Sequence, residues 1–241
     1  MISSVAVLSD IHGNAVALEA VLADVAAAPP GLIVLGGDLT WGPLPHETAE
    51  LLRELPAPAL LVRGNAERAL FERRSETPRE RWLLEVHTEE DMAFLNQAVE
   101  GVTVEIAGLG PVRFCHGSPR SDEELITPAT PEGRLRAAVA GRPEQVVVSA
   151  HTHLQFDRRA AGIRSVNPGS IGMPYAPAPG AYWAVLGPDV DLRRTEYDVE
   201  HAVAAYRQTG DPLAEQMVEI LLSPPTPDEV IAHAEALEFS G

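Results

Sequence analysis

The sequence predicts an α/β protein in which two β-sheets pack as a sandwich flanked by helices. In the first half of the chain, short apolar runs alternate with segments that repeat apolar residues at helical spacing, which is typical of βαβ units. From residue 102 the pattern changes to strand signals, beginning with a hairpin of residues 102–107 and 112–115 around the turn Gly108-Leu109-Gly110-Pro111. A sandwich of two sheets fits both patterns better than one open sheet.

The first half supplies three predicted strands and two predicted helices. The strands are the apolar runs 5–9, 32–35 and 59–62. Residues 15–22 repeat apolar side chains at helical spacing, and this pattern stops near Pro29-Pro30. The second helix covers residues 45–55, with Pro45 in its first turn and Pro56 beyond its end, because proline fits the first turn but cannot continue a helix.

Three further regions complete the expected architecture. Residues 66–98 read as a charged helical insertion, broken near Thr77-Pro78, and are the place for a lid or for partner contacts. The tail from Val199 reads as a helical appendage that packs on the core or against another subunit, and prolines divide it at Pro212 and again at 224–227. The remaining strands are expected at 146–149, 156–159, 163–166, 181–186 and 192–197, and the last four of these suggest the second sheet.

Five islands of metal-ligand residue types follow predicted strands. They are Asp10-Ile11-His12-Gly13-Asn14, Gly36-Gly37-Asp38, Gly64-Asn65, Cys115-His116-Gly117 and His151-Thr152-His153. Two divalent ions about 3.5–4 Å apart need a bridging carboxylate, terminal carboxylate and imidazole ligands, and an open position for water. Two aspartates, four histidines and an asparagine supply that set. Because side chains at strand ends can converge, the islands together predict a two-metal site.

Such a pair of ions acts on phosphate esters. It lowers the pKa of bound water toward neutrality and holds the non-bridging oxygens of a phosphoryl group. Hydrolysis of a phosphate ester is therefore the predicted reaction.

The islands resemble the calcineurin-like metallophosphoesterase superfamily, whose signature runs D-x-H, G-D, G-N-[HDC]-[DE], H and G-H-x-H. The resemblance covers residues 5–170, and with Asn167-Pro168-Gly169-Ser170 it looks most like the small bacterial and archaeal phosphodiesterase branch. It implies a four-layer αββα sandwich of two mixed sheets, and a hydroxide bridging two ions as the nucleophile. Carried over residue by residue, it implies that one ion is held by Asp10, His12 and His153, the other by Asn65, His116 and His151, and both by Asp38. Asp38, Asn65 and His116 are the candidate catalytic residues.

Two positions depart from the family pattern. Ala66 stands where many members have the residue assigned to leaving-group protonation, and general acid catalysis typically contributes 10²–10⁴-fold, so substrates with good leaving groups would suffer least. Glu67 fits the acidic position that follows, although in the family this residue more often orients the missing histidine, so its role here is open. Ala150 replaces the glycine that usually precedes the last two histidines, and it removes no ligand.

Further side chains are candidates for substrate contacts. Asn14 opens a helix whose N-terminus faces the islands, where free N–H groups favour phosphate; a plain N-cap is the alternative. Arg63 and Arg120 flank two ligand loops, and a guanidinium can bind phosphate through two hydrogen bonds, although each could equally form a structural ion pair. Tyr175, in a proline-rich loop, could stack on a nucleobase or simply pack.

Composition limits the partners. The 241 residues, 45% of them hydrophobic, are expected to form one domain over 1–241. A net charge of -17 argues against duplex nucleic acid, whereas ions among the aspartates would make a locally positive pocket for a small phosphodiester or nucleotide. The single cysteine and the absence of a signal stretch or an apolar run long enough to span a membrane predict a cytoplasmic protein, and a homo-oligomer is left open.

Three functions are compatible with these residues. The first is a metal-dependent phosphodiesterase for small phosphodiesters or nucleotides. The second is a phosphomonoesterase or dinucleotide polyphosphate hydrolase, and the third is a metal-loaded sensor of phosphate ligands without turnover. Mixed Asp, His and Asn ligands accept manganese, iron, nickel or zinc, and manganese is the working choice.

Overall fold

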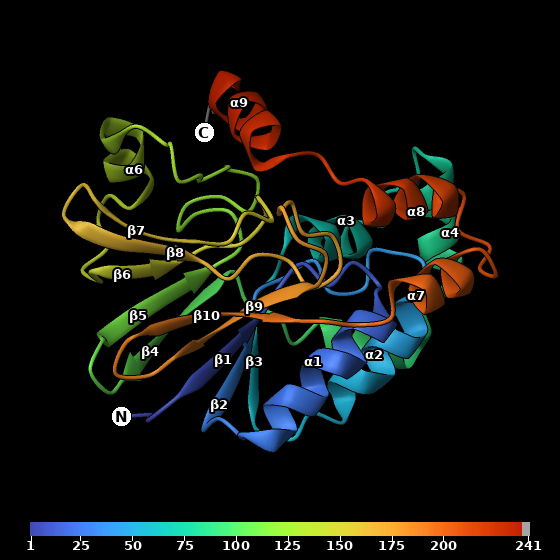
Figure 1. The fold of residues 1–241 in the computed structure, drawn as a ribbon, viewed down its shortest axis with the longest axis horizontal. Coiled ribbons are helices and arrows are strands. Elements are labelled where there is room, and N and C mark those ends of the chain that lie inside the picture. The colour runs from blue at the N-terminus through green and yellow to red at the C-terminus, as the bar shows by residue number, and fades with distance from the viewer. Residues whose placement is uncertain (238–241) are drawn as a thin grey trace.

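The computed structural model describes residues 1–237, and two five-stranded mixed sheets face each other at its centre (Figure 1). The first sheet has the order β10-β9-β1-β2-β3. Strands β1, β2 and β3 are parallel, whereas β9 is antiparallel to both β1 and β10. Their bounds are β1 Val5–Leu8, β2 Leu32–Leu35, β3 Ala59–Leu61, β9 Ala181–Leu186 and β10 Val190–Thr195.

The second sheet has the order β4-β5-β6-β8-β7. Strands β5, β6 and β8 are parallel, and the antiparallel strands β4 and β7 form its two edges. The bounds are β4 Gly101–Ile106, β5 Gly110–Cys115, β6 Val146–Val148, β7 Phe156–Ala160 and β8 Ile163–Asn167.

The side chains of β1 alternate between two cores. Val5 and Val7 belong to the apolar cluster between the sheets, which also contains Phe114 of β5. Ala6 and Leu8 face the other way, into the cluster that the flanking helices share. Because both faces of the strand are covered, it reads in sequence as a continuous apolar run.

Helices cover the outer face of the first sheet. Helix α1 (Ala15–Ala27) and α2 (Pro45–Arg53) contribute Leu18 and Leu52 to the core of that face. Helices α3 (Asn65–Phe71), α4 (Pro78–Val86) and α5 (Glu89–Leu95) make up the expected helical insertion, and each places one buried leucine in the same core. Thr77 and Thr88 cap α4 and α5 by accepting hydrogen bonds from backbone N–H groups, which explains the break near Thr77-Pro78.

The outer face of the second sheet is covered by a helix and by the tail of the chain. Helix α6 (Glu132–Ala138) packs Leu135 against Phe156 of β7. Helices α7 (Val199–Tyr206) and α8 (Ala214–Leu222) pack together beside α1, and α9 (Pro227–Ala236) crosses to the α6 side. There Glu235 accepts hydrogen bonds from Thr127, Thr130 and Arg134. The predicted four-layer sandwich is confirmed.

The structure differs from the expectation at particular elements. Strands β9 and β10 belong to the first sheet, where β9 pairs with β1 and β10 pairs with β9, although their position late in the chain suggested the second sheet. Helix α6 was not expected, whereas α1 ends at Ala27, close to the predicted stop near Pro29-Pro30. No helix in the described part of the chain is long and apolar enough to cross a membrane.

Candidate metal centre

The five ligand islands meet where loops leave the carboxyl ends of parallel strands. Asp10 and His12 follow β1, Asp38 follows β2, Asn65 begins α3 just after β3, His116 follows β5, and His151 and His153 follow β6. Within the described residues, ligand atoms form two groups in which all atoms lie within 4.8 Å of one another. The first group is Asp10, His12 and His153, and the second is Asp38, His116 and His151.

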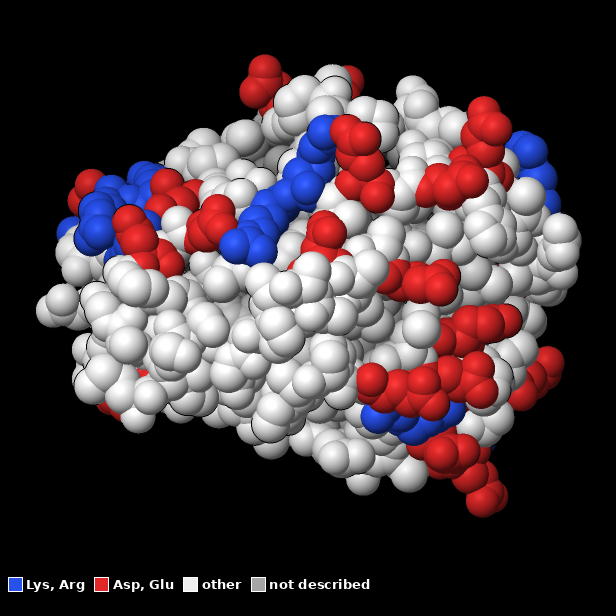
Figure 2. All heavy atoms as spheres, turned by 60° about the horizontal axis from the view of Figure 1, so that its bottom comes forward, with Lys and Arg blue, Asp and Glu red and all other residues white. Residues whose placement is uncertain are grey.

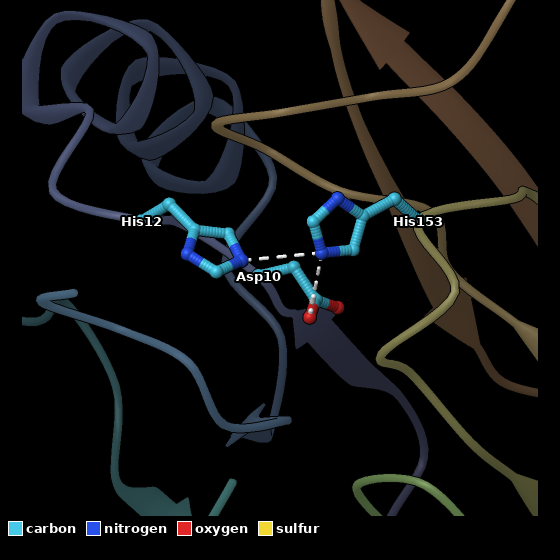
Figure 3. A group of neighbouring side chains, drawn as sticks. All are labelled: Asp10, His12 and His153. Carbon is cyan, nitrogen blue, oxygen red and sulfur yellow. Dashed lines mark hydrogen bonds and ion pairs between the residues drawn. The ribbon is translucent and has the colours of Figure 1, made fainter. Parts of the chain in front are cut away.

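In the first group, the possible metal-binding atoms of the three side chains point toward one another (Figure 3). The Nε2 atoms of His12 and His153 are 3.1 Å apart, and Asp10 Oδ1 lies 3.3 Å from Nε2 of His153. Each imidazole directs Nδ1 at a backbone carbonyl, that of Trp41 at 3.1 Å and that of Met173 at 2.8 Å, so with Nδ1 donating, each Nε2 carries a lone pair. Asp10 Oδ1 is buried and has no hydrogen-bond partner among the described residues. Two lone pairs and a carboxylate oxygen facing one another fit a divalent cation.

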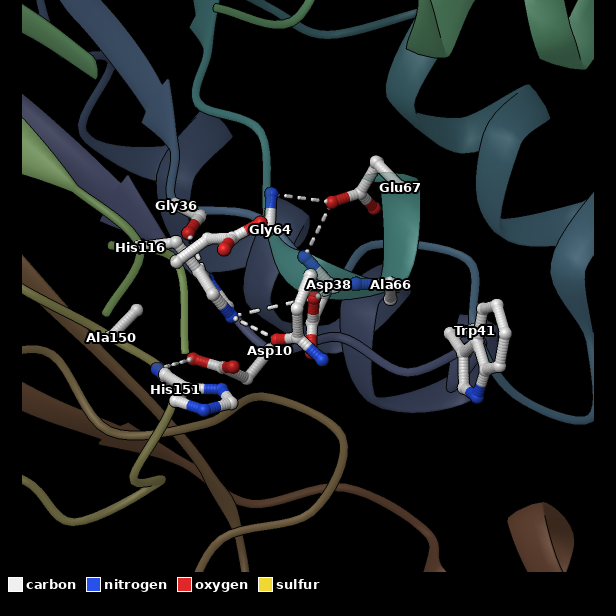
Figure 4. Close-up of polar contacts among 12 residues, drawn as sticks. Asp10, Gly36, Asp38, Trp41, Gly64, Ala66, Glu67, His116, Ala150 and His151 are labelled. Carbon is white, nitrogen blue, oxygen red and sulfur yellow. Dashed lines mark hydrogen bonds and ion pairs between the residues drawn. The ribbon is translucent and has the colours of Figure 1, made fainter. Parts of the chain in front are cut away.

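The second group repeats this arrangement (Figure 4). His116 directs Nδ1 at the Gly36 carbonyl at 2.8 Å, which leaves Nε2 facing Asn65 Oδ1 at 3.1 Å and Asp38 Oδ1 at 3.4 Å. The His151 ring lies beside His116, with ring centroids 4.9 Å apart. The side chains present therefore fit a second cation, with imidazole, amide and carboxylate donors.

Asp38 lies between the two groups. Its Oδ1 atom is 3.4 Å from Nε2 of His116, and its Oδ2 atom is 3.8 Å from Nε2 of His12. The backbone N–H of His151 also links the groups, because it donates to Asp10 Oδ2 at 3.2 Å. One carboxylate is thus in reach of both sets of donors.

The pKa values show that the site attracts positive charge. Burial alone would lower the pKa of His116, but the Asp38 carboxylate raises it to about 10. Burial would raise the pKa of Asp38, yet His116 and the other imidazoles hold it well below its usual range. Burial, reinforced by neighbouring imidazoles, lowers the pKa of His12 and of His151 to about 4, so these two candidate ligands are neutral near pH 7.

The backbone of the site is strained. Seven non-glycine residues in the described chain have a positive φ, and five of them are ligand candidates: Asp10 (50°), His12 (48°), Asp38 (53°), His151 (66°) and His153 (58°). The left-handed region costs an ordinary residue roughly 1–2 kcal/mol. Because five of the seven residues in this region are ligand candidates, we infer that the surrounding contacts impose these conformations and so orient the side chains.

Several supporting residues had no assigned role from the sequence. Ser9 donates from Oγ to Asp10 Oδ2 at 2.8 Å, and Ser170 donates to the Asp10 carbonyl at 2.6 Å. Asn167 donates to the carbonyl of Ala150 at 2.9 Å. Asn167 and Ser170 lie in the quoted Asn-Pro-Gly-Ser motif, which was the only signal for them. The contributions of the Trp41 and Met173 carbonyls had no signal in the sequence, since any residue type provides a backbone carbonyl.

The two departures from the family pattern have different consequences. Ala66 is buried and donates its backbone N–H to Asp38 Oδ1 at 3.0 Å, but its methyl group offers no proton. Ala150 has no positive φ, so its methyl group adds no strain of that kind, and its N–H donates to the His116 carbonyl at 2.6 Å.

The candidate substrate contacts are engaged within the protein. Asn14 is fully buried, and its Oδ1 accepts from the Ala17 N–H as an N-cap. Arg63 pairs with Glu100, Arg120 pairs with Glu124, and both arginines line a cavity of about 130 Å³ beside His116. Binding of a substrate by Asn14, Arg63 or Arg120 stays a prediction.

Comparison with known proteins identifies the family of this fold. The model of the calcineurin-like phosphoesterase superfamily domain matches residues 4–187. A metallophosphoesterase from Sphaerobacter thermophilus has 29% identity and a TM-score of 0.76 over 93% of this chain and all of that one. A hypothetical protein from Pyrococcus horikoshii shares the fold, with 21% identity and a TM-score of 0.76 over 92% of this chain and 99% of that one. An uncharacterized protein of Methanocaldococcus jannaschii is 26% identical in an alignment of length 228 that covers 83% of this chain and 90% of that protein.

The family match and the fold define the class of protein as a metallophosphoesterase. The chain belongs to the calcineurin-like phosphoesterase superfamily.

Proposed function

We propose that the protein is a metal-dependent phosphodiesterase that hydrolyses small phosphodiesters or nucleotides at a pair of divalent ions, with manganese as the working metal. The observation that carries the proposal is the convergence of imidazole lone pairs and carboxylate oxygens in two groups, with Asp38 between them. Asp10, His12 and His153 would hold one ion, Asn65, His116 and His151 the other, and Asp38 both.

The residues of the chain and the ions have separate tasks. Bound ions would supply a nucleophile from water at neutral pH and positive charge for the phosphoryl oxygens. The protein positions the donors through the backbone carbonyls of Trp41, Met173 and Gly36, which direct each Nε2 inward. Asp38 and Asp10 are buried, and their negative charge favours the binding of divalent ions at this site.

The missing proton donor supports a preference for substrates with good leaving groups. Position 66 carries a methyl group, and Glu67 is fully buried and bound to backbone N–H groups, so neither side chain can protonate a leaving oxygen. A leaving group that departs as a stable anion does not need that proton.

Surface charge supports a small substrate. Figure 2 shows Asp and Glu side chains mostly over the right half of this face and basic side chains mostly over its upper left, and the whole chain carries a net charge of -17. A long polyanion would be repelled by such a surface, whereas a small phosphorylated molecule meets mainly the local charge of the ion pair.

The test is turnover of bis(p-nitrophenyl) phosphate beside p-nitrophenyl phosphate by metal-stripped protein reloaded with manganese. We expect manganese-dependent cleavage of the diester, loss of that cleavage in Asp38→Asn, and wild-type turnover in the control Asp191→Asn. Asp191 is a suitable control because it is an exposed carboxylate on β10 that pairs with Arg193 at 2.8 Å. A preference for the monoester would replace the proposal with a phosphatase, and no turnover of either ester by metal-loaded protein would replace it with a sensor.

A further inference from the structure

Glu67 connects two of the ligand loops. It lies in the first turn of α3, its side chain is completely buried, and its carboxylate accepts three backbone hydrogen bonds, of which Figure 4 shows those from Asp38 and Gly64. Oε2 accepts from the N–H of Asp38 at 2.9 Å and of Gly64 at 2.8 Å, and Oε1 accepts from the N–H of Leu39 at 2.8 Å. Two of these donors belong to the loop after β2 and the third to the loop after β3.

Asp38 is hydrogen-bonded to two adjacent residues of α3. Asp38 donates its N–H to Glu67, and it receives at Oδ1 the N–H of Ala66, the residue just before Glu67. The backbone and the side chain of Asp38 are therefore held by adjacent residues of one helix turn. This restraint acts on a residue whose φ of 53° would otherwise be unfavourable.

There is no room for a side chain at Gly64 beside this contact. A Cβ atom added at Gly64 would lie 2.2 Å from Asp38 Oδ1 and 3.0 Å from Glu67 Oε2. The close approach of the two loops therefore requires the glycine of the Gly-Asn pair.

We propose that Glu67 is a positioning residue, which holds Asp38 and Asn65 in the relative placement that lets both ions bind. The inference rests on the proposed metal centre. It gives the acidic position of the motif a task that does not depend on the histidine missing at position 66, because Glu67 acts on the backbone of the loops.

A carboxylate is required by the number of donors. Three N–H groups need acceptors, and the two oxygens of Glu67 accept all of them. The amide of glutamine keeps the shape but has one oxygen, so its NH₂ group must face at least one N–H donor. Glu67→Gln therefore removes at least one of the three hydrogen bonds with little change in volume.

The experiment measures manganese binding to metal-stripped protein by calorimetry, together with backbone amide hydrogen exchange in the metal-free state. In Glu67→Gln we expect manganese affinity to fall by about 10- to 100-fold, as for other residues that support metal ligands. We also expect the amides of Asp38, Leu39 and Gly64 to exchange faster, with exchange in α1 unchanged.

Asp91→Asn is the matched control. Asp91 is likewise a fully buried acid at the third position of a helix, where it accepts the N–H of the capping residue Thr88, but its contacts lie away from the ligand loops. This variant should keep wild-type manganese affinity and wild-type exchange at the three amides.

Wild-type affinity in Glu67→Gln would overturn the proposal. Weaker binding with unchanged exchange would overturn it too, because charge alone would then act. If Glu67→Gln does not fold, Glu67→Asp, which withdraws both oxygens by one methylene, is judged by the same two measurements. If wild-type protein binds no manganese, the proposed function fails, and exchange at the three amides still decides the positioning role.

Discussion

The ring of Tyr175 stacks on the ring of His153, with centroids 5.0 Å apart and an angle of 19° between the planes. Tyr175 therefore covers a metal-ligand candidate, and a nucleobase could reach this face of the tyrosine only by displacing the imidazole. Its N–H also donates to the His153 carbonyl at 3.3 Å. The loop that carries Tyr175 thus restrains both the ring and the backbone of His153.

Replacement of Tyr175 by alanine should weaken metal binding modestly. An aromatic pair contributes about 0.5–1.5 kcal/mol beyond burial, so manganese affinity should fall roughly 2- to 10-fold, while Tyr175→Phe should keep it. Titration calorimetry on the two variants measures this. Equal affinity in Tyr175→Ala and wild type would show that the stacking does not support His153.

The two ligand groups should lose their ions separately. His153→Ala removes a donor of the first group and His116→Ala a donor of the second, so each variant should bind about one manganese ion per chain with near wild-type affinity. Both should lose hydrolysis, because the proposed reaction needs both ions. Elemental analysis after dialysis gives the stoichiometry, and wild-type hydrolysis in either variant would refute the site assignment.

Manganese should stabilise the stripped protein. An ion at about 100 times its Kd adds about 2.7 kcal/mol to the free energy of unfolding, and in a chain of this size each kcal/mol shifts Tm by roughly 2–4 °C. We therefore expect Tm to rise by about 5–10 °C per ion in a concentration-dependent way. Differential scanning calorimetry is the measurement, and Asp38→Asn, which weakens both sites, should show a much smaller rise.

Ala66→His should raise turnover of substrates with poor leaving groups more than turnover of p-nitrophenyl esters. General acid catalysis contributes up to about 10²–10⁴-fold, but Ala66 is only 4% exposed, so the new ring must displace neighbours and the gain should lie at the low end. The ratio of kcat for an alkyl and a nitrophenyl diester measures the effect. A ratio unchanged from wild type would show that position 66 does not face the leaving group.

Asp91 should make stability depend on pH in acid. Burial alone would raise its pKa, but hydrogen bonds from Arg53, Thr88 and His46 lower it to about 2, against 3.8 in an unfolded chain. The unfolded state therefore binds the proton first, and the contribution, about 2 kcal/mol, is present above pH 4 and lost as the pH falls toward 2. Urea unfolding at pH 5, 4, 3 and 2.5 should show the stability gap between wild type and Asp91→Asn narrowing. A constant gap would contradict the lowered pKa.

Much of the fold could be predicted from local patterns, because buried strands and amphipathic helices have characteristic periods. The strands before the ligand islands and the break near Thr77-Pro78 were found in this way. The assignment of β9 and β10 to the first sheet was not, since it depends on pairing of Val7 with Ala184, far apart in sequence. Helix α6 has only seven residues, too few for a clear period.

The sequence by itself determined which residues could be ligands: Asp10, His12, Asp38, Asn65, His116, His151 and His153 all follow strands, and their residue types fit divalent ions. Only the tertiary structure decided how they meet. The left-handed backbone of five of them, the direction of each imidazole nitrogen and the contact of Glu67 with two loops all depend on hydrogen bonds between segments distant in the chain. Such bonds leave no periodic trace in sequence, because their partners are mostly backbone groups, which every residue has.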